Sequence, residues 1–268
     1  MNQYLNINLP LLAEQCKALL IIASAKVRQM NDERLQGSAN IKSDQSLVTE
    51  VDIAIEKYLF QQLIPLLPNS SMLAEEEHHL SELKGYTWIL DPIDGTTNFV
   101  HSFPMYCISL ALYRDNKPVM GFIQDIPYDR CFWAIEGLEG CYLDDKRLTT
   151  SNTKDLQTSI LATGFPATAF DRLDEYMIHF KHLMQNTRGI RRLGSAALDL
   201  AYVAAGWCDG FFEYELKPWD VAAGAFLVMK AGGKVTDFNN GDNWLMGKQI
   251  IACNAGIHTE LYGIFKDK

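Results

Sequence analysis

The chain has 268 residues, of which 48% are hydrophobic and 21% charged, so it carries enough apolar side chains for a large core. Its 24 basic and 33 acidic residues give a formal charge of −9, which disfavours binding to nucleic acid or to an anionic membrane. Six cysteines without C-x-x-C spacing indicate free thiols in a reducing compartment, so we expect a cytoplasmic protein without a cysteine zinc site.

Two helices are predicted at the start, where apolar residues recur at helical spacing over 11–27 and again over 51–67. Thr49 is a candidate N-cap for the second helix. The first helix carries Glu14 and Lys17, which argues against a signal peptide and against a membrane span.

Short β-type runs separated by turn residues follow over 71–163 and predict a large antiparallel or mixed sheet: SMLA, YTWILD, CISLALYR, PVMGFIQD, CFWAIE and SILATG. After about residue 170 helical patterns (DEYMIHFKHLMQ, SAALDLAYVAAG, PWDVAAGAFLVMKAG) alternate with extended ones (IRRLG, DGFFEYE, GKVTDF, QIIACN). We therefore expect a layered α+β or α/β protein. The length favours a single domain over 1–268, made of two fused halves, roughly 1–150 and 151–268.

The stretch WILDPIDGTTNF carries the main chemical signal. An apolar strand over 86–90 ends at Asp91, Pro92 bends the chain, and Asp94 with Gly95 forms a tight turn. Two carboxylates this close resist joint ionisation unless a cation lies between them, and Mg²⁺ prefers carboxylate and backbone oxygens. The following GTTN can begin a short helix whose first amides would face a phosphate. The alternative is an ordinary turn in which one aspartate acts as a cap.

Two further acidic stretches bear on that choice. Glu75, Glu76 and Glu77 follow the short strand SMLA, and they form either a solvated edge or part of a site at a strand end. Asp220 lies in the first turn of a very apolar helix, where an unpaired buried carboxylate is costly. As a negative charge at a helix N-terminus it needs no metal, so both interpretations stay open.

Together these stretches resemble the inositol monophosphatase family over nearly the whole chain. The family pattern of a glutamate pair after a short strand, then W-x-x-D-P-I-D-G-T-x-N-F and later W-D-x-A-A-G, appears here as AEE, WILDPIDGTTNF and PWDVAAG. The resemblance implies a layered αβαβα sugar-phosphatase fold with mixed and antiparallel sheets and helix layers. It also implies a homodimeric phosphoric monoester hydrolase that uses two or three Mg²⁺ ions and is inhibited by lithium.

The resemblance further implies a role for each matching residue. It gives the metal ligands as Glu75, Asp91, the Ile93 carbonyl, Asp94 and Asp220. It gives the catalytic residues as Glu75, Thr96 and Asp91, with Glu75 and Thr96 orienting the water that attacks phosphorus directly. The amides of Gly95 and Thr96 match those that bind phosphate oxygens. In KSDQSLVTEVD, Lys42 and Asp52 match supporting residues, although this lysine lies one residue nearer the aspartate than in some relatives.

The segment GSAALDLAYVAAGWCDGFFE resembles the substrate side of the family's site. There Ser195 and Ala196 would lie near a sugar or cyclitol ring and Glu213 would accept hydrogen bonds from its hydroxyl groups, although Ser195 is equally a good helix N-cap. Trp207 departs from the A-G-R-x-D-G of many bacterial relatives, which puts any role of that arginine in doubt. A surface tryptophan could instead mark a dimer contact.

Three functions are compatible with these patterns. The first is Mg²⁺-dependent hydrolysis of inositol 1-phosphate to myo-inositol and phosphate, or of another small phosphate monoester such as histidinol phosphate or fructose 1,6-bisphosphate. The branch acting on 3'-phosphoadenosine 5'-phosphate usually reads D-P-L-D-G-T-K-x-F, which DPIDGTTNF does not match. The second is a partner of the transcription machinery that acts independently of catalysis, without direct nucleic-acid binding. The third is a metal-binding structural protein without turnover, which would need a defect at Thr96 or Glu75, and neither residue is missing.

Overall fold

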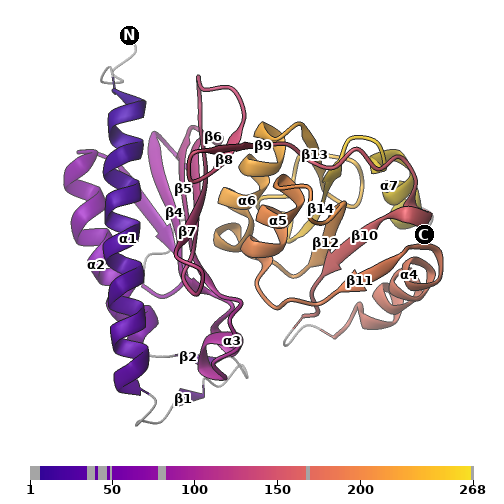
Figure 1. The fold of residues 1–268 in the computed structure, drawn as a ribbon, viewed down its shortest axis with the longest axis horizontal. Helices are drawn as coiled ribbons and strands as arrows, with labels where there is room; N and C mark the ends of the chain where they lie inside the picture. The colour runs from indigo at the N-terminus through magenta and orange to yellow at the C-terminus, as the bar shows by residue number, and fades with distance from the viewer. Residues whose placement is uncertain are drawn as a thin grey trace.

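The computed structural model describes residues 7–34, 40–41, 47–48, 50–77, 83–166 and 170–266. Figure 1 shows the elements stacked in the order helices, sheet, helices, sheet, helices. This arrangement confirms the predicted layered fold with mixed and antiparallel sheets. The predicted N-cap Thr49 and the predicted support Lys42 lie outside the described residues.

The first sheet has seven strands in the order β3-β4-β5-β6-β7-β8-β9, of which only the β3–β4 pair is parallel. Their bounds are β3 Ser71–Ala74, β4 Tyr86–Asp94, β5 Cys107–Arg114, β6 Lys117–Asp125, β7 Arg130–Ile135, β8 Cys141–Leu143 and β9 Lys146–Leu148. Side chains of β5 alternate between its two faces. Ile108, Leu110 and Leu112 pack with α1 (Leu9–Arg34) and α2 (Glu50–Leu66), whereas Ala111 and Tyr113 face the central helices.

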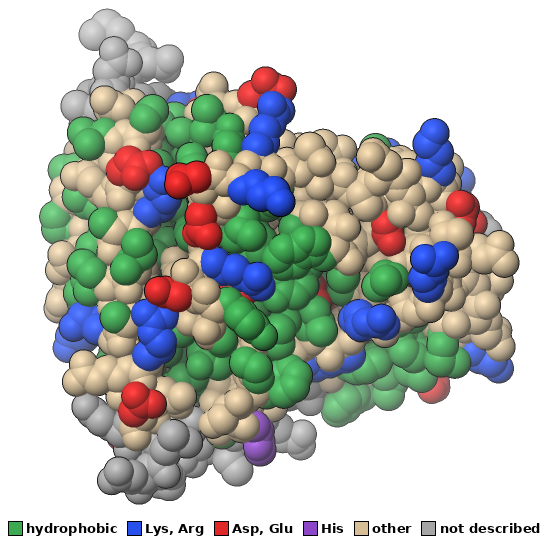
Figure 2. Space-filling view, viewed as in Figure 1, with side chains coloured by type: hydrophobic (Ala, Val, Ile, Leu, Met, Phe, Trp, Pro, Cys, Tyr) green, Lys and Arg blue, Asp and Glu red, His purple; other side chains and the backbone are tan. Residues whose placement is uncertain are grey.

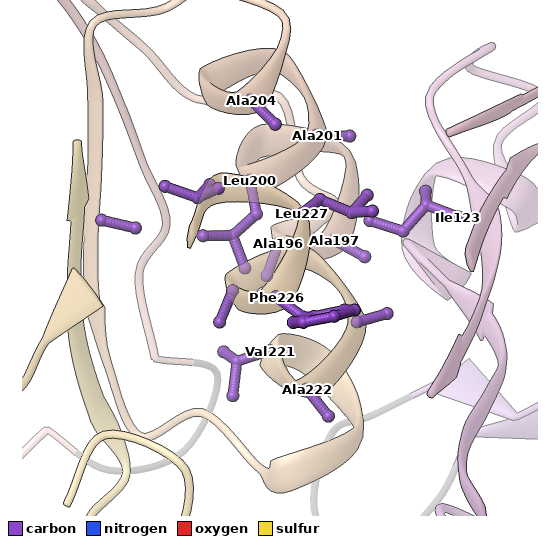
Figure 3. Packing of buried hydrophobic residues seen from close by; sticks show 14 of the residues in the cluster. Ile123, Ala196, Ala197, Leu200, Ala201, Ala204, Val221, Ala222, Phe226 and Leu227 are labelled. Atoms are coloured by element: carbon purple, nitrogen blue, oxygen red, sulfur yellow. The ribbon is translucent and has the colours of Figure 1, made fainter. Parts of the chain in front are cut away.

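The central layer consists of α5 (Ala196–Ala204) and α6 (Pro218–Lys230). Figure 3 shows Ala197, Ala201, Phe226 and Leu227 of these helices packed together, with Ile123 of β6 reaching them from the first sheet. Gly224 permits this packing, because a Cβ there would lie 2.5 Å from Leu200 Cβ. The close crossing of α5 and α6 therefore explains the small residues AAG in PWDVAAG.

The second sheet has five strands in the order β11-β10-β12-β14-β13. Their bounds are β10 Ile160–Thr163, β11 Gly189–Arg191, β12 Gly210–Tyr214, β13 Gly233–Thr236 and β14 Gln249–Asn254. Its outer face packs against α4 (Leu173–Asn186) and α7 (His258–Lys266) through Tyr176, Leu261 and Phe265. Four short elements complete the described chain: β1 (Asn40–Ile41), β2 (Leu47–Val48), α3 (Thr96–Val100) and the 3₁₀ turn η1 (Leu156–Thr158).

Several predicted boundaries were wrong. The first helix extends from Leu9 to Arg34, because its polar last turns continue the helix beyond the apolar periodicity. The β8–β9 hairpin and α7 were not predicted, since both are short and rich in polar residues. The strand expected to end at the first aspartate runs on to Asp94, with a register shift against β5 between Asp91 and Asp94.

One apolar cluster joins side chains of both sheets with those of α5 and α6. The single domain over 1–268 with two fused halves stays a prediction, with which this shared core is consistent. All six cysteines are free and buried, as expected. Within the described ranges, no helix is both long and apolar enough to cross a bilayer. On the face drawn in Figure 2, basic and acidic side chains are interspersed around apolar ones.

Candidate active site

The irregular end of β4 brings two carboxylates together. Asp91 Oδ1 accepts a hydrogen bond of 3.0 Å from the amide of Ile93, which bends the chain around Pro92. Gly95 follows with φ +90°, and a Cβ there would lie 2.7 Å from the Met105 carbonyl oxygen, so only glycine fits without strain. The short helix α3 (Thr96–Val100) begins directly after it, as the GTTN sequence predicts.

Asp94 is held by the N-terminus of α5, a helix from the second half of the chain. Its Oδ2 accepts hydrogen bonds from the Ser195 hydroxyl and, at 2.8 Å, from the Ala197 amide. The same hydroxyl accepts from the Leu198 amide at 3.3 Å, so Ser195 is the N-cap of α5. Ser195 therefore also fixes the orientation of the Asp94 carboxylate.

Asp220 reaches the same place from α6. Pro218 begins this helix, and the Lys217 amide donates to Asp220 Oδ2 at 2.6 Å. The Ser109 hydroxyl of β5 donates to the Trp219 carbonyl at 3.1 Å. Because Ser109 is the cross-strand partner of Asp91, this bond places the first turn of α6 beside the end of β4.

The three aspartates form one cluster, in which one oxygen from each of Asp91, Asp94 and Asp220 lies within 4.8 Å of the others. Burial raises the pKa of Asp91 well above its ordinary value, and the charges of Glu75, Asp94 and Asp220 raise it further. Burial and the neighbouring Asp94 raise the pKa of Asp220 to about 7. Converging buried oxygens that repel one another fit a hard divalent cation, which would stabilise their ionised forms.

Glu75 lies next to this cluster without being part of it. Glu75 follows Ala74, the cross-strand partner of Leu90, so it lies beside Asp91, and its charge adds to burial in raising the pKa of Asp91. Glu56 of α2 fixes the turn that carries Glu75. Its carboxylate accepts hydrogen bonds from the amides of Glu76 and Glu77, at 2.8 Å each. The acidic run is therefore a fixed turn at a strand end.

Two α3 residues and one α2 residue support the turn. The Thr96 hydroxyl donates to the Ile93 carbonyl at 3.0 Å, so two predicted site residues contact one another directly. Asn98 Nδ2 donates to the carbonyls of Met105 and Leu193 at 2.7 and 2.8 Å, and it thereby ties α3 to the chain before α5. Asp52 is buried on α2, and its charge also raises the pKa of Asp91.

A cavity of about 180 Å³ opens beside Asp94 and Asp220. Its lining consists of Asp94, Gly164, Arg192, Gly194, Ser195, Ala196, Asp199, Glu213, Leu216 and Asp220. Glu213 is on β12, and burial raises the pKa of its carboxyl to about 8. A larger cavity of about 700 Å³ lies between the start of α1 and β7, but its mostly apolar lining lacks the converging carboxylates, so we assign the site to the smaller one.

The structure thus brings most of the predicted residues to one place, where the two halves of the chain meet. Asp91, Ile93, Asp94, Gly95, Thr96, Ser195, Ala196, Glu213 and Asp220 surround the turn and its cavity, with Glu75 and Asp52 alongside. Three residues near the site were missed: Glu56, Asp199 and Arg192. For Asp199 the available signal was a single charge within an apolar helical run, and for Arg192 it was the short basic run RGIRR; Glu56, which lies next to Lys57, carried no such signal.

Comparison with known proteins agrees with this geometry. Residues 9–267 match the family model described as the inositol monophosphatase family. The Nus factor SuhB of Pseudomonas aeruginosa is 40% identical over 222 residues, which cover 81% of this chain and 82% of that protein.

Two solved structures are similar along almost their whole length. The inositol monophosphatase from Anabaena (Nostoc) sp. PCC 7120 has a TM-score of 0.83 and 35% identity, covering 96% of each chain. The staphylococcal SaIMPase-II bound to inositol monophosphate has a TM-score of 0.81 and 30% identity, covering 96% of this chain and 94% of that one. With the buried aspartate cluster at the end of β4, these matches show that the chain belongs to the inositol monophosphatase family.

Proposed function

We propose that this protein hydrolyses a phosphate monoester of a small polyol, with inositol 1-phosphate as the first candidate substrate and Mg²⁺ as the cofactor. One observation carries the proposal: carboxylate oxygens of the buried Asp91 and Asp94 and of the partly buried Asp220 converge within 4.8 Å beside a cavity that is lined by groups able to bind an alcohol. A structural metal site would not need such a cavity. The similarity to phosphatases, one of them described with inositol monophosphate bound, supports the same assignment.

The ligand set proposed for Mg²⁺ is Glu75, Asp91, the Ile93 carbonyl, Asp94 and Asp220. Bound divalent cations would neutralise the phosphate and acidify the attacking water. The chain's own contribution is to fix these oxygens in advance, since Asp94 is held by Ser195 and Ala197 and Asp91 by the Ile93 amide. Because these oxygens are already in place, no free energy is needed to reorient them during the reaction.

The attacking water and the phosphate are assigned to the turn after β4. In this proposal Glu75 and the Thr96 hydroxyl orient the water, and Glu75 accepts its proton. The amides of Gly95 and Thr96 donate to phosphate oxygens, because the first amides of a helix have no intrahelical acceptor. The leaving alcohol then lies along the cavity toward Ala196 and Glu213, which line it.

The assay is phosphate release by the purified protein with Mg²⁺, on inositol 1-phosphate, histidinol phosphate, fructose 1,6-bisphosphate and 3'-phosphoadenosine 5'-phosphate. An EDTA arm measures metal dependence, and a lithium arm tests the inhibition that the family resemblance implies. Preference for inositol 1-phosphate would support the full proposal. Preference for another ester would keep the chemistry and change the substrate, whereas no metal-dependent release from any ester would refute the enzyme function.

Asp94→Asn provides the matching mutational test. Asparagine keeps an oxygen that can accept from Ser195 and Ala197, but it loses the negative charge at the centre of the cluster. We expect turnover to fall by at least about a hundredfold while thermal stability is retained. Full activity in this variant would show that Asp94 is not a metal ligand. Asp237→Asn, in the turn after β13, is a matched control remote from the cavity lining.

A role as a partner of the transcription machinery is the second candidate, and the Nus factor names of the curated relatives favour it. Direct contact with nucleic acid is not part of this proposal, since the net charge is −9 and the charges in Figure 2 are mixed in sign. A pull-down of RNA polymerase components with the wild-type protein and with Asp94→Asn separates the two roles. Equal capture by both forms would indicate binding that is independent of catalysis.

A homodimer also remains a proposal, to be tested by light scattering after gel filtration. Trp207 is 46% exposed, so it is available for a contact. The guanidinium of Arg130 lies 5.0 Å from the centre of the Trp207 ring, and its Nε donates to the buried Asp125 at 2.8 Å. A guanidinium is thus present at this surface, although the arginine of the A-G-R-x-D-G pattern is replaced.

A further inference from the structure

One carboxylate of the cavity has no part in the proposed chemistry. Asp199 is on α5, one turn beyond Ser195, and its side chain is only 1% exposed although it lines the cavity with Glu213. Its Oδ1 has no hydrogen-bond partner within the described part of the chain. An unpaired buried carboxylate oxygen is costly, so a ligand group that donated a hydrogen bond there would be bound favourably.

The neighbours of Asp199 restrict what that ligand group can be. Burial raises the pKa of Asp199 well above its ordinary value, the charges of Glu213 and Asp94 raise it further, and Arg192 lowers it. Two neighbouring carboxyl groups in one cavity offer hydrogen-bond acceptor oxygens in either protonation state, so they favour a ligand group with hydrogen-bond donors. Arg192 is exposed and lines the same cavity, and its charge offsets the raised pKa values of the two acids only in part.

The position of Asp199 relative to the aspartate cluster indicates which part of a substrate it meets. Asp94 and Asp220 line the same cavity as Asp199 and Glu213. An ester whose phosphate lies at the aspartate cluster would therefore extend its alcohol part toward Asp199 and Glu213. The torsion that orients an aspartate carboxyl group is soft, so Oδ1 can turn toward a donor without moving α5.

We propose that Asp199 is a second hydrogen-bond acceptor for the alcohol part of the substrate, and that with Glu213 it selects alcohols carrying hydroxyl or ammonium donors. This inference rests on the phosphatase function proposed above and adds a specificity-determining residue to it. If Glu213 were the only acceptor, one hydrogen-bond donor on the alcohol would be enough. The pair requires two donors on the side of the alcohol that faces away from the phosphate.

The test measures kcat and KM for three esters that differ in the alcohol: inositol 1-phosphate with hydroxyl donors, histidinol phosphate with an ammonium donor, and phenyl phosphate with neither. The proteins are the wild type, Asp199→Ala, Asp199→Asn and the control Asp237→Asn. Asp237 is a good match because it too is a buried aspartate, but its Oδ1 accepts the amides of Asn239 and Gly241 at 2.8 and 2.7 Å, which an asparagine oxygen can also do.

We expect Asp199→Ala, which removes both acceptor oxygens, to lower kcat/KM about 10- to 100-fold for a donor-bearing ester, chiefly through KM, and to change kcat/KM for phenyl phosphate by less than about twofold. Asp199→Asn keeps one acceptor oxygen and should lose less. A loss confined to inositol 1-phosphate or to histidinol phosphate would support the proposal and identify the donor as hydroxyl or ammonium. Asp237→Asn should behave like the wild type. Circular dichroism checks the fold, and Asp199→Asn carries the test if the alanine variant does not fold.

An equal change for all three esters, or no change for any, would overturn the role of Asp199 while the phosphatase function stood. A wild-type protein that releases no phosphate from any ester with Mg²⁺ would overturn the proposed function and this inference together. The two failures are therefore distinguished by the wild-type protein alone.

Discussion

Replacing Glu213 by glutamine should stabilise the metal-free protein by an amount that grows with pH. Glu213 is 8% exposed, and its carboxylate packs so closely on Gly164 that a Cβ there would lie 2.1 Å from Oε1. Burial is the main cause that raises the pKa of this carboxyl from 4.5 to about 8, with Arg192 opposing it and the charges of Asp220 and Asp94 adding to it.

The sign and size of the effect follow from proton binding. The folded protein holds the Glu213 proton up to about pH 8, whereas the unfolded chain releases it near pH 4.5, so stability falls as the pH rises through that window. At about 1.4 kcal/mol per pKa unit, the destabilisation is about 1 kcal/mol at pH 5 and about 4 kcal/mol at pH 8. Glutamine does not ionise, so the advantage of Glu213→Gln should grow by about 3 kcal/mol between these pH values.

The assay is urea denaturation in EDTA at several pH values between 5 and 8. The control is Glu215→Gln, which makes the same change two residues along the chain, where the carboxylate lies 3.7 Å from Lys248 Nζ. The control protein should keep the destabilisation that Glu213 causes as the pH rises, because its Glu213 is unchanged. A difference between Glu213→Gln and the wild type that is independent of pH would refute the reasoning, because it would mean that Glu213 is ionised in the fold.

Two further substitutions test the supports of the site. Gly95→Ala should destabilise the protein by about 1–3 kcal/mol in thermal unfolding, because φ is +90° and the new Cβ would meet the Met105 carbonyl oxygen; unchanged stability would contradict this conformation. Glu56→Ala should lower both stability and turnover, because it leaves the amides of Glu76 and Glu77 without their acceptor, at about 1.5–3 kcal/mol per charge-assisted bond. Glu56→Gln, which keeps one acceptor oxygen, should lose less than the alanine variant, and equal losses would exclude the positioning role.

Local chemistry explains how much of the fold could be predicted. The strands β4 to β7 were recognisable because apolar residues fill both faces of the first sheet, and α6 because Pro218 and Asp220 mark its first turn. The β8–β9 hairpin and α7 escaped prediction because their stability comes from packing on elements distant in sequence. Leu261 and Phe265, for example, bury against the outer face of the second sheet.

The candidate site, too, has one part that the local sequence predicts and another part that depends on packing between distant segments. The sequence alone predicts that Asp91 and Asp94 lie close together, because DPIDG places them three residues apart on one bent strand end. It could not determine the third carboxylate's position, since Asp220 joins the cluster only through the packing of α6 on β5 and the bond from Ser109 to Trp219.

Tertiary structure also decided what several residues do. Ser195 looked like a substrate contact or an N-cap in the sequence, and the fold makes it the N-cap of α5 and the orienting donor for Asp94. Asp199 looked like one charge in an apolar helix, yet the fold buries it in the cavity. The physical reason is that a side chain's chemistry is local, whereas its burial and its partners depend on where the two halves of the chain meet.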